Sequence, residues 1–161
     1  MNYQEFLSSK TERPSHSPLS RTSGFGESLF PFQRDIVEWA ARLGRAAIFG
    51  DCGIGKTLIQ LEWASADDGI TLIAAPLAVS DQTIAEGERF GIEVKRARDI
   101  DDVHESCGIW ITNYERLGKF GALGDTFSSI VLDESSILKS FAGKTRNAII
   151  AQSLGVPHRL A

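Results

Sequence analysis

Short apolar runs alternate with amphipathic segments along most of this 161-residue chain. Within each run the apolar residues are consecutive or nearly so, which is typical of strands that a parallel sheet buries on both faces. Glycine or polar residues bound the runs. The runs predict strands at Ala46–Phe49, Thr71–Ala75, Glu93–Arg96, Ile109–Asn113 and Ser129–Leu132.

Segments with apolar residues at helical spacing lie between these runs. The first begins at Pro31, a residue suited to the first turn of a helix, and its apolar face continues to Gly44. Further helices are predicted at Lys56–Ser65, Val79–Phe90 and Lys144–Leu154. The alternation of strands and helices predicts an α/β fold, with a mostly parallel sheet covered by helices on both faces.

The N-terminal region has a different character. Residues 2–10 carry Tyr3, Phe6 and Leu7 at the spacing of a short amphipathic helix. Residues 11–26 are rich in Ser, Thr, Pro and Gly, which is typical of a loose tether. We therefore expect a flexible segment over residues 1–28 and one domain over 29–161. A docking role for the segment and no role at all are equally compatible with its sequence.

Composition excludes several classes of protein. The formal net charge is −4, so the chain lacks the basic excess typical of a dedicated duplex binder. Any contact with nucleic acid must be local, or made by parts that are not in this chain. No apolar run approaches the roughly 20 residues of a membrane span. The two cysteines, Cys52 and Cys107, form neither metal-ligand spacing nor a disulfide framework, which fits a reducing cytoplasm.

No functional role is assigned to the remaining charged run or to the histidines. The run of arginines and acids over residues 96–102 is interpreted as a solvated connection between strands. His16, His104 and His158 form no cluster with acidic residues at ligand spacing, so no chemistry is assigned to them.

Residues 50–57 read GDCGIGKT and satisfy the P-loop (Walker A) pattern G-x-x-x-x-G-K-[ST]. Gly50, Gly53 and Gly55 allow backbone angles that turn successive N–H groups toward phosphate oxygens. Lys56, at the start of a helix, is placed to reach the β- and γ-phosphates, and the Thr57 hydroxyl to hold Mg²⁺. The pattern predicts a site for ATP and Mg²⁺.

The alternative is a chance match in a glycine-rich turn. It leaves unexplained the apolar strand before the loop and the helical continuation LIQLEWA after it. Cys52 occupies an unconstrained position of the loop and is treated as a filler.

A P-loop ATPase needs an acidic partner at the end of a neighbouring strand, and the run SSIVLDESS supplies one. Asp133 and Glu134 directly follow the apolar residues, at the edge of the sheet where ligands bind in open α/β folds. Asp133 is predicted to bind Mg²⁺, and Glu134 to orient and deprotonate the attacking water. An isolated Asp-Glu pair would otherwise be read as a solvated turn.

Together these motifs resemble the superfamily 2 helicases and translocases, of the DEAD/DEAH-box type, and most closely the Swi/Snf-like branch with its small phage and bacterial members. LFPFQRDIVEW, at residues 29–39, looks like the opening L-x-P-[YF]-Q-x-x-x-V-x-W element of that branch. The resemblance implies that Gln33 reads the adenine edge and senses bound nucleotide. An ordinary amphipathic helix would explain Val37 and Trp39 but not Gln33.

Two further segments resemble elements that contact nucleic acid in this family. LIAAPLAVSDQT contains an A-P-L segment whose backbone, at Pro76 and Leu77, is implied to lie against the tracking strand. ITNYERL is similar to I-T-x-Y-E-x-L, which implies that Thr112 and Asn113 approach phosphates. Tyr114 in that segment is as readily explained by packing alone.

The final matching segments are DESSILKS and GKTRNAI, which are similar to D-E-A-H-x-I-K-N and to the Lys-Thr that begins the next helix. Lys139 and Lys144 match in place, although solvated surface lysines would look the same. Ser135 and Ser136 depart from the family pattern, and the serine at 136 puts in doubt how hydrolysis is coupled to later motifs. PHRLA looks like the start of the next strand.

The resemblance covers residues 29–161 and implies the first RecA-like domain of an ATP-dependent DNA helicase or translocase, with RNA as the alternative partner. A second RecA-like domain with arginine fingers is expected but absent from this chain, so we expect little turnover from it alone. Catalysis would rest on Glu134 and Lys56. The alternatives are a P-loop ATPase, or a nucleotide-binding module, that does not act on nucleic acid.

Overall fold

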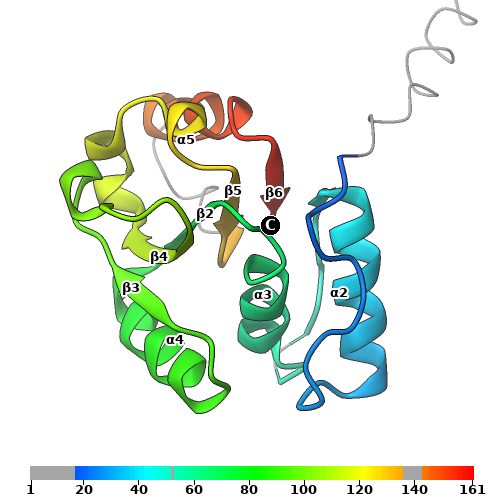
Figure 1. Ribbon diagram of the computed structural model, residues 1–161. Helices are drawn as coiled ribbons and strands as arrows, with labels where there is room; N and C mark the ends of the chain where they lie inside the picture. The colour runs from blue at the N-terminus through cyan, green and yellow to red at the C-terminus, as the bar shows by residue number, and fades with distance from the viewer. Residues whose placement is uncertain (1–16, 52, 136–142) are drawn as a thin grey trace, which may run out of the picture.

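The computed structural model describes residues 17–51, 53–135 and 143–161, and these form one six-stranded sheet (Figure 1). Every strand pair is parallel, and the order across the sheet is β1-β6-β5-β2-β4-β3. The α/β class and the parallel sheet predicted from the sequence are confirmed. The strands are β1 (Arg45–Ala46), β2 (Ile70–Ala75), β3 (Val94–Arg96), β4 (Gly108–Asn113), β5 (Ser129–Leu132) and β6 (His158–Leu160).

The predicted helices form with shifts of at most two residues at their ends. They are α2 (Pro31–Leu43), α3 (Lys56–Ala64), α4 (Leu77–Arg89) and α5 (Gly143–Leu154). Gly44 ends α2 in the left-handed conformation, with φ 70°. Three short 3₁₀ helices follow strands or turns: η1 (Ile100–Asp102), η2 (Tyr114–Phe120) and η3 (Leu123–Asp125). None of the described helices is long and apolar enough to span a membrane.

Each face of the sheet is buried in its own apolar core, as consecutive strand residues point to opposite faces. Ile73 of β2 packs with α2 and α3 residues such as Val37 and Leu61. Leu72 of the same strand joins Phe120 and Ile149 in the second core, under η2 and α5. Figure 1 shows α5 on the other side of the sheet from α3 and α4. This two-sided covering explains why the central strands β2 and β5 are mostly apolar.

The first strand is shorter than predicted. The sequence predicts Ala46–Phe49, but β1 holds only Arg45 and Ala46. Its single neighbour, β6, pairs with those two residues, and one further backbone bond joins the Ile48 N–H to the Ala161 carbonyl. Phe49 is 97% exposed, so the apolar run does not continue into the core. Apolar character alone therefore overestimated a strand at the edge of the sheet.

The loose tether predicted over residues 11–26 is wrong for its described part, residues 17–26. Leu19 and Phe25 are buried in the core beside α2 and α3. The Leu19 N–H donates to the Ala41 carbonyl, and the Arg21 N–H donates to the Ala66 carbonyl. Two buried apolar side chains separated by small polar residues supply enough packing to fix the segment. The helix predicted at residues 2–10 lies outside the described residues.

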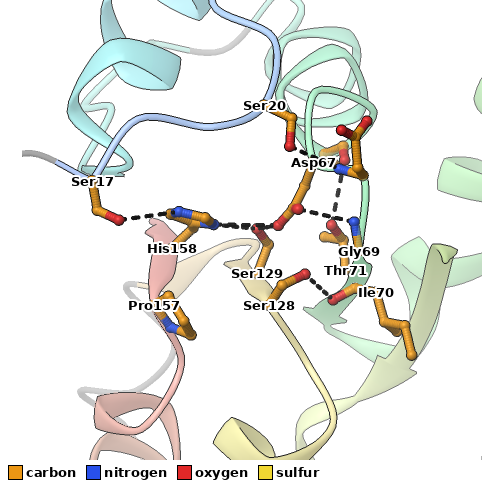
Figure 2. Close-up of polar contacts among 12 residues, drawn as sticks. Ser17, Ser20, Asp67, Gly69, Ile70, Thr71, Ser128, Ser129, Pro157 and His158 are labelled. Carbon is orange, nitrogen blue, oxygen red and sulfur yellow. Dashed lines mark hydrogen bonds and ion pairs between the residues drawn. The ribbon is translucent and has the colours of Figure 1, made fainter. Parts of the chain in front are cut away.

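A polar cluster joins this segment to the amino ends of two strands (Figure 2). His158 Nδ1 lies 3.3 Å from an Asp67 carboxylate oxygen, and His158 Nε2 lies 3.3 Å from the Ser17 hydroxyl. The Ser129 hydroxyl donates to the same oxygen of Asp67. Burial alone would raise the pKa of Asp67, but the bonds from His158, Ser129 and the Gly69 N–H outweigh it and hold this pKa well below its usual range. Sequence spacing gave no sign of His158 because its partner is far away along the chain.

Because of this cluster, the free energy of unfolding is expected to depend on pH. The folded-state pKa of Asp67 is depressed, so its contribution to stability is full above the unfolded pKa of about 3.9 and is lost as the pH falls below it. Asp67→Asn is expected to lower the free energy of unfolding by about 1–3 kcal/mol at pH 7, and by less at pH 3. Urea unfolding at both pH values measures this, with exposed Asp68→Asn as the control. Equal destabilisation at both pH values would contradict the role of the charge.

Candidate functional site

A pocket of about 310 Å³ lies at the carboxyl edge of the sheet, where the P-loop and the Asp-Glu turn meet. The residues of both motifs that line it are Gly50, Lys56, Asp133 and Glu134. The fold thus brings Gly50 and Lys56, which are predicted to bind phosphate, together with Asp133 and Glu134. Among the described residues, Gln33 and Thr57 do not line this pocket: Gln33 lies in α2 and Thr57 is the second residue of α3.

The three glycines of the P-loop differ in backbone conformation and surroundings. Gly53 and Gly55 adopt left-handed angles, with φ 86° and φ 78°, as predicted for a loop that turns its N–H groups inward. Gly50 does not; a Cβ there would meet the end of the Ile54 side chain at 2.1 Å, and that side chain would have to shift. Gly55 is also the N-cap of α3, so the positive end of that helix dipole faces the pocket.

Lys56 lies across the mouth of the loop. Its ammonium group donates to the carbonyl of Gly50 at 3.0 Å and to the carbonyl of Asp51 at 3.1 Å. These are neutral acceptors, whereas phosphate oxygens carry charge and form stronger bonds with an ammonium group. A bound phosphate would therefore compete favourably with these two carbonyls for the Lys56 ammonium group.

Gln33 ties α2 to the P-loop. The side chain is 4% exposed; its oxygen accepts from the Phe30 N–H at 2.9 Å, and its amide nitrogen donates to the Ile54 carbonyl at 2.7 Å. A Cβ on Gly55 would lie 2.4 Å from this nitrogen, so the glycine makes the contact possible. The reading of an adenine edge by Gln33 stays a prediction. The structure adds a direct bond through which Gln33 positions the loop.

Asp133 is buried, at 7% exposure, and is held from three sides. Its backbone N–H donates to the Ala74 carbonyl at 2.9 Å, and its carbonyl accepts from the Tyr114 hydroxyl at 2.7 Å. The Gln60 amide donates to one carboxylate oxygen at 2.8 Å. Sequence reasoning missed Gln60. The available signal was its position four residues after Lys56, which places both on one face of α3.

Glu134 has φ 52°, and it is the only non-glycine residue with positive φ in the described ranges 17–51, 53–135 and 143–161. Such a conformation costs of order 1 kcal/mol or more for a residue with a side chain, and it persists only where surrounding bonds impose it. Three hydrogen bonds hold the preceding residue, Asp133. Glu134 itself is exposed and lines the pocket that Lys56 also lines.

The sequence predicts that the Asp133–Glu134 turn follows a strand next to the one before the P-loop, but β5 is not adjacent to β1. β6 lies between β1 and β5, so the pocket spans three strands and also contacts Leu160. A strand that follows both motifs in sequence can still insert between them, which local pattern cannot reveal. Ser135 lines the pocket as well. Ser136 and Lys139 lie outside the described residues, as does the Lys144 side chain.

The donor set at the pocket fits Mg²⁺ carried with phosphates. No cluster of three or more His, Cys, Asp or Glu side chains forms an all-protein metal site within the described part of the chain. Mg²⁺ is usually bound by one or two carboxylates together with substrate phosphates and water. The buried Asp133 carboxylate, oriented by Gln60, is suited to be that protein ligand.

A second pocket, of about 320 Å³, lies at the carboxyl ends of β3 and β4. We call it the arginine-lined pocket. Its lining residues are Leu77, Arg96, Ala97, Arg98, Thr112, Asn113 and Arg116. Three of the four residues implied to contact nucleic acid thus share one site, while Pro76 immediately precedes Leu77. The arginines near residue 96 are exposed, as predicted, but they also face this pocket.

Two polar atoms at this pocket lack partners. The Thr112 hydroxyl oxygen and the Asn113 side-chain oxygen are buried without a hydrogen bond among the described residues. Buried polar groups are normally satisfied, because leaving one unpaired costs about 1–3 kcal/mol. The Thr112 hydroxyl can donate to an anionic ligand, whereas the Asn113 oxygen can only accept and requires a donor group. With three arginines in the lining, the pocket favours a ligand that carries both anionic and donor groups.

The fold is similar to those of several solved structures. The Sulfolobus solfataricus SWI2/SNF2 ATPase core in complex with dsDNA aligns with a TM-score of 0.69 and 20% identity, over 90% of this chain and 34% of that one. Two structures of UvsW from bacteriophage T4, one titled a helicase, give TM-scores of 0.68 and 0.66 at 16% identity. Each covers 99% of this chain, which spans 34% and 59% of theirs.

At these identities the likeness establishes the fold alone, and that fold is the one that the sequence resemblance implied. This chain spans about a third of the first two matched structures. No protein-family model matches the sequence, and no curated protein matches it significantly.

Proposed function

We propose that this chain is the ATP-binding domain of an ATP-dependent DNA helicase or translocase, which couples ATP hydrolysis to movement on nucleic acid. The observation that carries the proposal is the pocket at the carboxyl edge, which Lys56, Asp133 and Glu134 line together. A nucleotide-binding module with no hydrolytic role would not need a glutamate with a strained backbone in the same pocket as Lys56, the lysine proposed to bind phosphate.

Each residue has a defined part in this function. The loop N–H groups and Lys56 bind the phosphates, and Gln33 holds the loop in place through Ile54. Thr57 and Asp133 would hold Mg²⁺, which neutralises charge on the phosphates when bound. Glu134 orients the attacking water and accepts its proton.

The nucleic-acid part of the proposal rests on the arginine-lined pocket. Arg96, Arg98 and Arg116 supply local positive charge on a chain whose net charge is −4. Arg96 is ion-paired with Asp81, so Arg98 and Arg116 contribute most of this charge. Arginine forms paired hydrogen bonds with phosphate, and the Thr112 hydroxyl adds a donor. The dsDNA bound to the SWI2/SNF2 ATPase core agrees with this assignment. We further propose that a second RecA-like domain completes the ATP site with an arginine, as the family resemblance implies.

Charge reversal at this pocket tests nucleic-acid binding. Arg116→Glu is expected to weaken binding of single- and double-stranded oligonucleotides about three- to tenfold, whatever their sequence, and to lower the salt dependence. The control is Arg89→Glu, the same change at an exposed residue on the opposite end of α4 from Leu77. Fluorescence anisotropy of labelled oligonucleotides measures both. No binding by the unmodified chain, or equal losses in both variants, would favour an ATPase that does not act on nucleic acid.

A further inference from the structure

Tyr114 is adjacent in sequence to residues of the arginine-lined pocket, and it bonds to Asp133, which lines the other pocket. It directly follows Thr112 and Asn113, and it is the first residue of η2, which also carries Arg116. Its side chain is 3% exposed, and its hydroxyl donates to the Asp133 carbonyl at 2.7 Å. The interpretation of Tyr114 as a packing residue is therefore incomplete, because one short helix reaches both the arginine-lined pocket and the Asp-Glu turn.

The bond from Tyr114 acts on the strained part of the ATP site. The other two bonds at Asp133 come from the sheet, through Ala74, and from α3, through Gln60. Only the bond from Tyr114 comes from the element that contributes Arg116. The next residue, Glu134, has φ 52°, so a small change in the direction of the Asp133 carbonyl rotates the peptide that positions Glu134.

The other end of this link has a reason to move when a ligand arrives. The Thr112 and Asn113 side-chain oxygens are buried without partners among the described residues, and both belong to the two residues before Tyr114. A ligand that accepts from the Thr112 hydroxyl, or that donates to the Asn113 oxygen, changes the forces on this short stretch of backbone. Tyr114 itself remains a donor at neutral pH, since burial and the carboxylates of Asp133 and Glu134 raise the pKa of its hydroxyl.

We propose that Tyr114 is a positioning residue that couples occupancy of the arginine-lined pocket by nucleic acid to the geometry of the Asp133–Glu134 turn. The inference rests on the proposed function. It adds the route by which nucleic acid regulates the ATP site. Because coupling between two sites is reciprocal, nucleic acid changes nucleotide affinity by the same factor by which nucleotide changes nucleic-acid affinity.

The test compares coupling in the unmodified chain with coupling in Tyr114→Phe, which removes the hydroxyl and keeps the ring. The affinity for a fluorescent non-hydrolysable ATP analogue with Mg²⁺ is measured with and without a saturating poly(dT) oligonucleotide. In the unmodified chain the oligonucleotide is expected to change this affinity at least about fivefold. In Tyr114→Phe each ligand alone binds with its original affinity, and the change falls below about twofold. A purely structural role would not separate binding from coupling in this way.

Ser153→Ala is the matched control, because it removes another buried hydroxyl, which bonds to Ile149 far from both pockets. It is expected to keep full coupling. Full coupling in a folded Tyr114→Phe, or absence of coupling in an unmodified chain that binds both ligands, overturns the inference and leaves the proposed function standing. Failure of the unmodified chain to bind one of the ligands overturns both. Thermal unfolding of each variant confirms that it is folded.

Discussion

Replacing Lys56 with alanine is expected to weaken binding of MgATP at least about 100-fold. The ammonium group lies at the mouth of the P-loop, where it now bonds the Gly50 and Asp51 carbonyls. Each hydrogen bond to a charged group contributes about 1.5–3 kcal/mol, so the loss of two bonds to phosphate corresponds to about 3 kcal/mol or more. Isothermal titration of nucleotide into the chain measures the change.

The control for this substitution is Lys119→Ala, since Lys119 is exposed and does not line the pocket. It is expected to bind nucleotide as the unmodified chain does. Lys56→Ala is expected to unfold at nearly the same temperature as the unmodified chain, because among the described residues the Lys56 ammonium group bonds only the carbonyls of Gly50 and Asp51. Unchanged nucleotide affinity in a folded Lys56→Ala would place the phosphates elsewhere.

Glu134→Gln is expected to keep nucleotide affinity within about twofold and to slow ATP hydrolysis about 10²- to 10⁴-fold, the range of a lost general base. Glutamine has the same size and the same tolerance of φ 52°, so the turn at Asp133 is preserved. It can still orient water but cannot accept a proton at neutral pH. Steady-state phosphate release by the full-length protein measures the rate, and titration measures the affinity.

The matched control is Glu88→Gln, which alters an exposed glutamate on α4 outside the pocket. Its hydrolysis rate is expected to equal that of the unmodified protein. If Glu134→Gln lost nucleotide affinity as severely as Lys56→Ala, Glu134 would be a binding group rather than the base.

The parts of the site that follow from sequence are those in which local pattern determines the geometry. The P-loop needs left-handed glycines directly before a helix, and Gly53, Gly55 and Lys56 meet that need within four consecutive residues. Asp133 and Glu134 follow a buried strand, so their place at the carboxyl edge was predictable from the run before them. The parallel sheet itself followed from continuous apolar runs.

The parts that did not follow depend on contacts between distant segments. Gln60 and Tyr114 meet Asp133 from two other elements, and polar residues inside a helix or after a strand carry no mark of their partners. Asp67 and His158 lie 91 positions apart, so no spacing rule pairs them. Residues 17–26 look like a tether because their two buried side chains, Leu19 and Phe25, lie among small polar residues.

The central claim is that the pocket between Lys56 and Glu134 is the ATP site of a nucleic-acid motor. The most direct test is the rate of ATP hydrolysis by the full-length protein with Mg²⁺, measured without nucleic acid and with saturating single- or double-stranded DNA. We predict that at least one form of DNA raises the rate several-fold, and that Lys56→Ala abolishes the activity in every condition. A rate that neither form of DNA changes would contradict the claim.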